Sequence, residues 1–124
     1  MDQTILIVDD QFGIRALLSE LFNTEGYTTL SAANGVEALQ IIAQQVPDLV
    51  LLDMKIPGMD GLEILQRIRE VQPDQKVVMM TAYGELNMID KAVELGIIGH
   101  FIKPFDIEEL RNSVNSWLSM TTTA

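Results

Sequence analysis

Short apolar runs alternate along the whole chain with longer stretches of helical periodicity, and this alternation constrains the fold more than any other feature. Continuous apolar runs of this length are typical of strands buried on both faces of a parallel sheet. Stretches with apolar residues three and four positions apart predict amphipathic helices that cover such a sheet. The apolar runs span residues 5–8, 49–52 and 77–80, and two further strand-like segments span 27–33 and 97–102.

Each predicted strand is followed by a predicted helix with its own start or stop signal. Gly26 and Gly96 are placed to end the first and fourth helices, and the fourth helix is predicted over 85–95. Five β–α units are too few for an eight-unit barrel, which needs about 250 residues. We therefore expect an α/β fold with a single doubly wound (βα)5 flavodoxin-like parallel sheet of strand order 2-1-3-4-5. The predicted caps at helix starts are Asn34, Asp60 and Asp106.

Length and composition narrow the class of protein further. The 124 residues fit one domain, which we expect over 1–124, with its core in 4–118, a frayed tail in 119–124 and no output domain. The formal charge of -10 argues against binding to nucleic acid or to an anionic membrane. Because the chain has no cysteine, no signal-peptide pattern and no apolar run of about 18 residues, we expect a cytoplasmic protein.

Polar side chains follow four of the predicted strands at the point where each strand ends. Asp9 and Asp10 follow the first strand, Asp53 ends the third, Thr81 ends the fourth, and Lys103 follows the fifth. Ligands of open α/β sheets bind at the carboxyl ends of the strands, where the strand order reverses. The first and third strands are neighbours in the expected order, so three carboxylates should share one crevice with a hydroxyl and an ammonium.

This set of side chains predicts metal-assisted phosphoryl chemistry. Three neighbouring carboxylates either raise one another's pKa values or share a cation, and ligands that are all oxygen favour Mg²⁺. A hydrated Mg²⁺ and a lysine together neutralise charge on a transferring phosphoryl group. A carboxylate can itself be the nucleophile. Asp53 is the best candidate because it lies between the acid pair and the side that carries Thr81 and Lys103.

Each of these residues also has a purely structural interpretation. The acid pair after the first strand could solvate a loop or cap the next helix. Asp53 could start a turn, Thr81 could be satisfied by the backbone, and Lys103 could be a solvated surface charge. The functional interpretation depends on finding all of them together at the ends of four strands of one sheet.

Four segments carry a resemblance to a known family. They are Ile5–Gln11 (ILIVDDQ), Leu49–Gly61 (LVLLDMKIPGMDG), Met80–Gly84 (MTAYG) and His100–Asp106 (HFIKPFD). Each segment is weak alone, but together, in this order and at these spacings, they resemble response-regulator receiver domains over residues 4–118. The resemblance implies a switch or carrier of phosphoryl groups that assists its own phosphorylation and is not an enzyme with turnover on a small molecule.

The resemblance implies a role for each residue of the predicted crevice. Asp53 would accept a phosphoryl group from a phosphohistidine on a sensor histidine kinase, and Thr81 and Lys103 would contact the transferred group. In this family the peptide bond before the equivalent of Pro104 is commonly cis. The implied ligands of Mg²⁺ are Asp9, Asp10, Asp53 and the backbone carbonyl of Lys55.

Within this family, the chain is similar to single-domain regulators of sporulation phosphorelays in Asp10–Arg15, Asp53–Gly61, Thr81–Leu86 and His100–Asp106. Such regulators pass the phosphoryl group onward to a histidine phosphotransferase, and an aspartyl-phosphate phosphatase is a further implied partner. The family usually carries Tyr or Phe three residues before the lysine, whereas this chain has His100, as the relay regulators do. His100 is either a half-buried packing residue or a proton-linked switch.

The resemblance also implies a docking surface for partner helices beside the crevice. We expect Ile14 and Leu17 to be partly exposed there, because a helix on a parallel sheet needs only one buried stripe, whereas Leu18 should face the core. We expect the protein to be a monomer. The other residues assigned to this surface are Gln11, Gly13, Tyr83, Pro104 and Phe105.

Three other functions compete with the relay. A single-domain regulator could act by phosphorylation-dependent binding alone, as in chemotaxis, and onward transfer distinguishes the two. Haloacid-dehalogenase phosphatases use an aspartyl nucleophile with Mg²⁺, but they need a second Asp two residues later, where this chain has Lys55 after Asp53 and Gln11 after Asp9. An inactive pseudo-receiver is disfavoured by the complete set of acidic, Thr and Lys residues.

Overall fold

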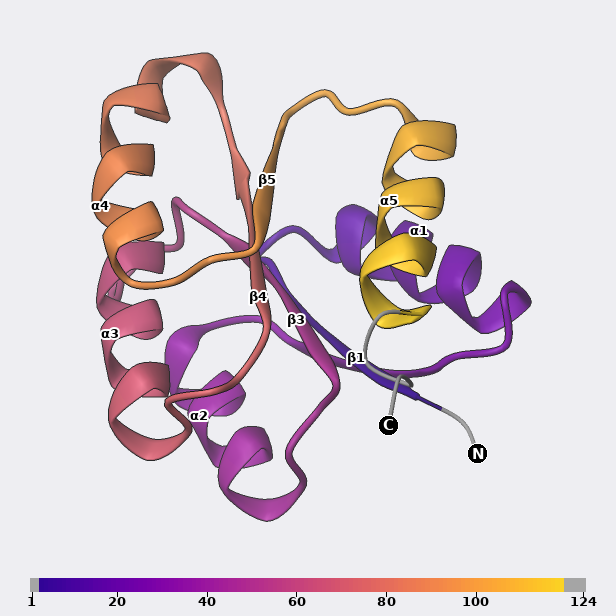
Figure 1. The fold of residues 1–124 in the computed structure, drawn as a ribbon, viewed down its shortest axis with the longest axis horizontal. Helices are drawn as coiled ribbons and strands as arrows, with labels where there is room; N and C mark the ends of the chain where they lie inside the picture. The colour runs from indigo at the N-terminus through magenta and orange to yellow at the C-terminus, as the bar shows by residue number, and fades with distance from the viewer. Residues whose placement is uncertain (1–2, 120–124) are drawn as a thin grey trace.

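The computed structural model describes residues 3–119, apart from the side chains of residues 83, 84 and 86, and a parallel sheet forms its centre. The strand order is β2-β1-β3-β4-β5, which confirms the predicted doubly wound topology. Helices lie on both sides of this sheet (Figure 1). The strands are β1 (Thr4–Val8), β2 (Thr28–Ala32), β3 (Leu49–Asp53), β4 (Val77–Thr81) and β5 (Gly99–Ile102).

The two faces of the sheet bury separate apolar clusters. Every residue of β1, β3 and β4 is buried, as the continuous apolar runs predict. Successive side chains point to opposite faces, so Ile5 and Ile7 join one cluster while Leu6 and Val8 join the other. Helices α1 (Phe12–Thr24) and α5 (Ile107–Ser119) cover the first cluster (Figure 1). The second cluster is covered by α2 (Gly35–Gln44), α3 (Gly61–Val71) and α4 (Ile89–Glu94).

The three predicted helix caps are confirmed. Asn34 accepts a hydrogen bond from the N–H of Glu37 at 2.9 Å, and Asp60 accepts one from the N–H of Glu63 at 2.9 Å. The carboxylate of Asp106 accepts N–H bonds from the first turn of α5. Each cap satisfies a donor that the helix itself leaves unpaired, so short polar side chains determine where these helices start.

Two predicted boundaries are wrong, those of the fourth helix and of the C-terminal tail. The helix predicted over 85–95 is divided into a 3-10 helix, η1 (Tyr83–Met88), and α4. The short fifth strand expected within 97–102 is present as Gly99–Ile102, and it starts at Gly99 because the N–H of Ile97 still bonds to the last turn of α4. Ser119 belongs to α5 and not to a tail, and residues 120–124 lie outside the described part of the chain.

The loop after β3 is folded tightly against the end of that strand. Gly61 starts α3 and donates its N–H to the carbonyl of Met54 at 2.7 Å. A Cβ atom added at Gly61 would lie 2.6 Å from the Met54 Cα and 2.7 Å from the Asp53 carbonyl oxygen. Only a residue without a side chain fits there. The close approach fixes the backbone that carries Asp53.

The helices of the described part of the chain are all too short or too polar to cross a bilayer.

Candidate functional site

A crevice opens at the carboxyl edge of the sheet, between the loops that follow β1, β3, β4 and β5. This is the edge at which the sequence predicts the polar residues to meet, and the neighbouring positions of β1 and β3 bring their loops together. The crevice is lined by Asp10, Gln11, Asp53, Lys55, Ile56, Pro57, Ala82, Glu85 and Lys103.

Three carboxylates gather in and beneath this crevice. One oxygen atom from each of Asp9, Asp10 and Asp53 lies within 4.8 Å of the others. Asp9 is fully buried, Asp53 is 6% exposed and Asp10 is exposed. Carboxylate oxygens at this spacing form the kind of ligand set that hard divalent cations prefer. The predicted juxtaposition of the three acids is therefore present, and the cluster could hold such a cation.

Asp9 accepts hydrogen bonds at both carboxylate oxygens and at its carbonyl, and these bonds fix its position in the acid cluster. One carboxylate oxygen accepts a hydrogen bond from the Lys103 ammonium at 2.7 Å, and the other accepts the N–H of Gln11 at 2.9 Å. The Asp9 carbonyl accepts a bond from the Arg15 guanidinium at 2.8 Å. Asp9 in this structure mainly positions Lys103 and the loop after β1.

Lys103 links Asp9 to Asp53. Its ammonium lies 2.7 Å from an oxygen of Asp9 and 3.4 Å from an oxygen of Asp53. Burial disfavours the ammonium, but the hydrogen bond to Asp9 and the charge of Asp53 outweigh burial and raise the pKa of Lys103. The backbone N–H of Lys103 donates to the Thr81 carbonyl, and the bond from Lys103 to Pro104 is cis. Lys103 therefore carries a positive charge beside Asp53 throughout the neutral pH range.

The Asp53 carboxyl group is harder to ionise than an ordinary aspartate. Burial is the main cause, the negative charge of Asp9 adds to it, and Lys103 opposes both. The pKa of Asp53 is raised to about 6. Asp53 is thus ionised at neutral pH, as a nucleophile or metal ligand must be, but its charge is incompletely compensated. A further positive charge in the crevice would stabilise it.

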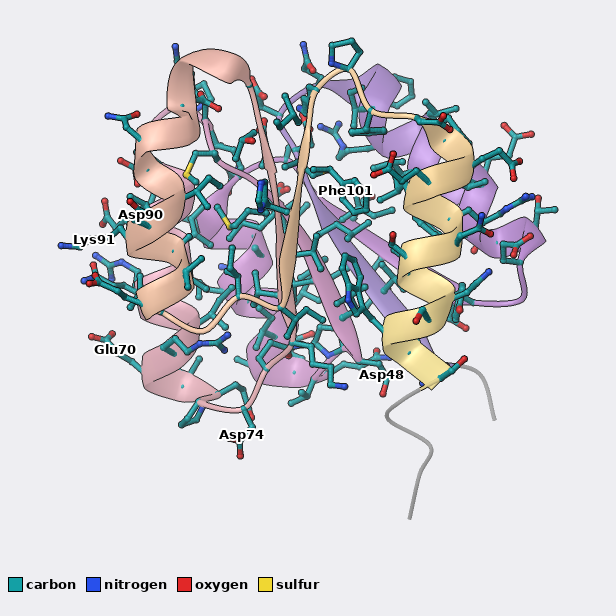
Figure 2. The ribbon with its side chains drawn as sticks, turned by 45° about the horizontal axis from the view of Figure 1, so that its top comes forward. Asp48, Glu70, Asp74, Asp90, Lys91 and Phe101 are labelled. Atoms are coloured by element: carbon teal, nitrogen blue, oxygen red, sulfur yellow. The ribbon has the colours of Figure 1, made fainter. Side chains whose placement is uncertain are left out.

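The Thr81 side chain is turned away from the crevice. Its hydroxyl is buried and donates a hydrogen bond to the Phe101 carbonyl at 3.3 Å. Figure 2 shows the Phe101 side chain on the side of β5 that faces α5, where it packs against Trp117. The structure therefore brings Asp9, Asp10, Asp53 and Lys103 together but does not place the Thr81 hydroxyl among them.

An apolar groove adjoins the crevice between α1 and the loop after β5. Ile14 is half-buried and Leu17 is 46% exposed, whereas Leu18 is fully buried, as the helical spacing predicts. Gly13 is exposed next to Ile14. The side chain of Tyr83 lies outside the described part of the structure. The groove is lined by Gln11, Ile14, Leu17, Lys103, Pro104, Phe105 and Ile107.

His100 does not lie in the crevice or the groove. It is exposed on the edge strand β5, so its interpretation as a half-buried packing residue is wrong. It lines a neighbouring pocket with Asp106 and with Pro104 and Phe105, which also line the groove. Its role in switching stays a prediction.

Sequence reasoning missed Glu85 and Ala82 as residues of the crevice. The Glu85 carboxylate accepts a hydrogen bond from the Ala82 N–H at 2.9 Å, and both residues line the crevice. The three-residue spacing of Ala82 and Glu85 is the sequence signal for this contact, because a Glu three residues after a helix cap can accept a hydrogen bond from the N–H of that cap. Ala82 itself offers no side chain that would reveal a cap.

Comparisons with known proteins agree with this geometry. A sequence profile described as "Response regulator receiver domain" matches residues 5–115. "Sporulation initiation phosphotransferase F" of Bacillus subtilis (strain 168) is 58% identical to this chain over 120 residues, which is 97% of each protein. "Regulatory protein AtoC" of Escherichia coli is 40% identical over 94% of this chain but only 25% of the larger relative.

Solved structures show the same fold. A response regulator receiver domain protein (CheY-like) from Methanospirillum hungatei matches with a TM-score of 0.91 at 29% identity, over 97% of this chain and 96% of that one. The receiver domain of NtrX from Brucella abortus matches with a TM-score of 0.87 at 32% identity, over 93% of this chain and 98% of that one.

The raised pKa of Asp53 predicts a pH-dependent stability. The folded protein holds this proton more tightly than the unfolded chain, so Asp53 favours folding at acidic pH and loses that contribution as the pH rises through about 6. In metal-free buffer, the free energy of unfolding of Asp53→Asn should rise relative to that of the wild type by about 2 kcal/mol between about pH 4 and about pH 7.5. Urea unfolding at several pH values measures this difference.

Asp90→Asn is the matched control, because Asp90 projects from α4 into solvent (Figure 2). The same drift with pH in this control, or a constant difference for Asp53→Asn, would contradict the raised pKa.

Proposed function

Because the chain belongs to the family of response regulator receiver domains, we propose that it is a carrier in a phosphorelay. It accepts a phosphoryl group on Asp53 from a sensor histidine kinase and passes the group to a histidine phosphotransferase. The observation that carries this proposal is the ionisable Asp53 carboxylate, held in a crevice between an acid pair and the Lys103 ammonium.

The relay is proposed to serve sporulation initiation. The B. subtilis relative is named for that process and aligns with this chain over 97% of each protein. That match supports a carrier in the same kind of relay, which we propose acts in the cytoplasm with an aspartyl-phosphate phosphatase as a further partner. Relatives such as AtoC are about four times longer than the matched part, so their activities are not carried over.

The transfer step requires one bond to form as another breaks. An oxygen of Asp53 attacks the phosphorus of a phosphohistidine, the O–P bond forms, the N–P bond breaks, and the imidazole leaves with the bonding electrons. Lys103, which lies 3.4 Å from an Asp53 oxygen, neutralises charge on the incoming phosphoryl oxygens. The histidine of a phosphotransferase reverses the same exchange when it takes the group onward.

The acid cluster is proposed to bind Mg²⁺. Asp9, Asp10, Asp53 and the Lys55 carbonyl would be the ligands, with Asp9 reaching the ion from the buried side. When bound, Mg²⁺ would offset part of the negative charge of the carboxylates and of the transferring group. The hydrogen bonds from Lys103 and Gln11 to the two Asp9 oxygens would hold this carboxylate in place for the ion.

Thr81 is proposed to contact the phosphoryl group once it is in place. The Thr81 hydroxyl now donates to the Phe101 carbonyl, so it must rotate to reach the crevice. Such a rotation would couple the state of Asp53 to β5 and its neighbouring loop. His100 on β5 lies on the same strand and is proposed to take part in this switch.

The groove beside the crevice is proposed to dock partner helices. On α1, Leu17 is exposed and Ile14 is half-buried. Both line the same groove as Lys103. A partner helix bound there would bring its histidine next to Asp53. Gln11, Gly13, Tyr83, Pro104 and Phe105 complete the proposed surface.

The phosphoryl acceptor is tested directly with a purified phosphohistidine donor and MgCl₂. Mass spectrometry should show one phosphoryl adduct on wild-type protein and none on Asp53→Asn, because Asp53 supplies the attacking oxygen. Chelation of the metal with EDTA should block adduct formation and leave the fold intact, since the core is apolar.

An unchanged rate of transfer in EDTA would disprove the metal assignment, and a full adduct on Asp53→Asn would disprove the acceptor. A phosphoprotein that a histidine phosphotransferase cannot discharge would favour the regulator that acts by binding alone. Steady hydrolysis of a phosphate monoester would favour the phosphatase.

The docking groove predicts a specific kinetic defect. Ile14→Ala should slow transfer from the protein donor by about tenfold, the loss typical of a central apolar contact in an interface. Val36→Ala truncates a similarly apolar side chain that is 58% exposed on α2, and it should transfer at the wild-type rate. Rapid-quench measurements on folded variants give the rates. Normal kinetics for Ile14→Ala would remove Ile14 from the docking surface.

A further inference from the structure

The Glu85 carboxylate occupies a backbone donor at the mouth of the crevice. Its oxygen accepts the N–H of Ala82 at 2.9 Å, and both residues line the same crevice as Asp53 and Lys103. The Lys103 ammonium already contacts two carboxylates. The Ala82 N–H is therefore a hydrogen-bond donor at the crevice whose present acceptor is the Glu85 carboxylate.

The strand register places Ala82 above Asp53. Asp53 on β3 pairs with Met80 on β4, so Ala82 lies two residues further toward the carboxyl edge, or roughly 6–7 Å at the usual rise of a strand. A phosphoryl group on Asp53 extends from the carboxylate into the crevice that Ala82 and Glu85 line. The Ala82 N–H and the Glu85 carboxylate are thus on the side of Asp53 where new negative charge would arrive.

A second anion changes the balance at this donor. Phosphoryl oxygens are strong acceptors that favour backbone N–H groups. Like charges that share a crevice repel each other, and at Glu85, whose bond to Ala82 is reached by solvent, this repulsion is moderate. A phosphoryl group on Asp53 would compete with Glu85 for the Ala82 N–H and would be repelled by the Glu85 charge.

We propose that Glu85 is a built-in competitor for the phosphoryl group. Its carboxylate must leave the Ala82 N–H before this amide can donate to an anion on Asp53, and its charge lowers the affinity of the crevice for that anion. Glu85 thereby sets how readily Asp53 is loaded. This inference rests on the proposed role of Asp53 as the phosphoryl acceptor.

The two possible roles of Glu85, competitor or simple helix cap, predict opposite effects of its removal on anion binding. If Glu85 only capped η1, its removal would loosen the segment that follows Ala82 and weaken anion binding. As a competitor, its removal strengthens anion binding. Glu85→Gln keeps an acceptor for the Ala82 N–H but removes the charge, and Glu85→Ala removes both.

Beryllofluoride with saturating MgCl₂, a mimic of a phosphoryl group on a carboxylate, tests the competition. Binding is followed by amide NMR, which also reports whether each variant is folded. In the wild type the Ala82 amide signal should move on saturation as its partner changes. Both Glu85→Gln and Glu85→Ala should bind beryllofluoride about fivefold more tightly than the wild type, the effect of removing one nearby like charge.

Glu94→Gln is the matched control, because Glu94 is exposed at the end of α4 and is not among the residues that line the crevice. Its affinity should equal that of the wild type. Wild-type or weaker binding by folded Glu85→Gln and Glu85→Ala would overturn the inference, and so would an equal gain in Glu94→Gln, which would assign the effect to net charge. If the wild type binds no beryllofluoride, the proposed function fails first and the inference fails with it.

Discussion

The Lys103 ammonium lies between two buried carboxylates, and the chemistry of the crevice depends on this interaction. It bonds to Asp9 at 2.7 Å and lies 3.4 Å from Asp53. One positive charge cannot compensate three acids, so Asp9 is satisfied while Asp53 remains reluctant to ionise, with its pKa at about 6. The crevice is thus short of positive charge beside the Asp53 carboxylate. A divalent cation would balance this deficit, and it would also offset the negative charge of an arriving phosphoryl group.

The buried strands of the sheet hold the backbone that carries Asp9, Asp53 and Lys103 in fixed positions. β1, β3 and β4 are wholly buried, and Gly61 holds the loop after β3 against the strand end. The charged groups therefore meet with little freedom to relax, which keeps Asp53 and Lys103 close to each other. The more exposed parts around this edge, the α1 groove, η1 and β5, are where we propose that partners bind and the switch acts.

Most of the fold and the charged part of the site follow from local sequence patterns. Apolar runs predict the buried strands, and acids at the ends of two neighbouring strands predict the cluster of Asp9, Asp10 and Asp53. The hydrogen-bond partners of the side chains could not be predicted from the sequence, because they depend on tertiary contacts. The Thr81 hydroxyl donates to the Phe101 carbonyl of β5. The Glu85 carboxylate accepts the N–H of Ala82, and η1 starts directly after Ala82, earlier than the apolar spacing indicates. A pattern gives the place of a side chain along the chain, whereas its rotamer follows from the packing around it.

An NMR titration of the Asp53 carboxyl carbon, in metal-free buffer and again in saturating MgCl₂, tests this account most directly. The charge deficit predicts a pKa of about 6 without metal and a value below that of an ordinary aspartate once a divalent cation is bound. An ordinary pKa in metal-free buffer that does not respond to MgCl₂ would show that Asp53 is not the uncompensated acid of a cation site.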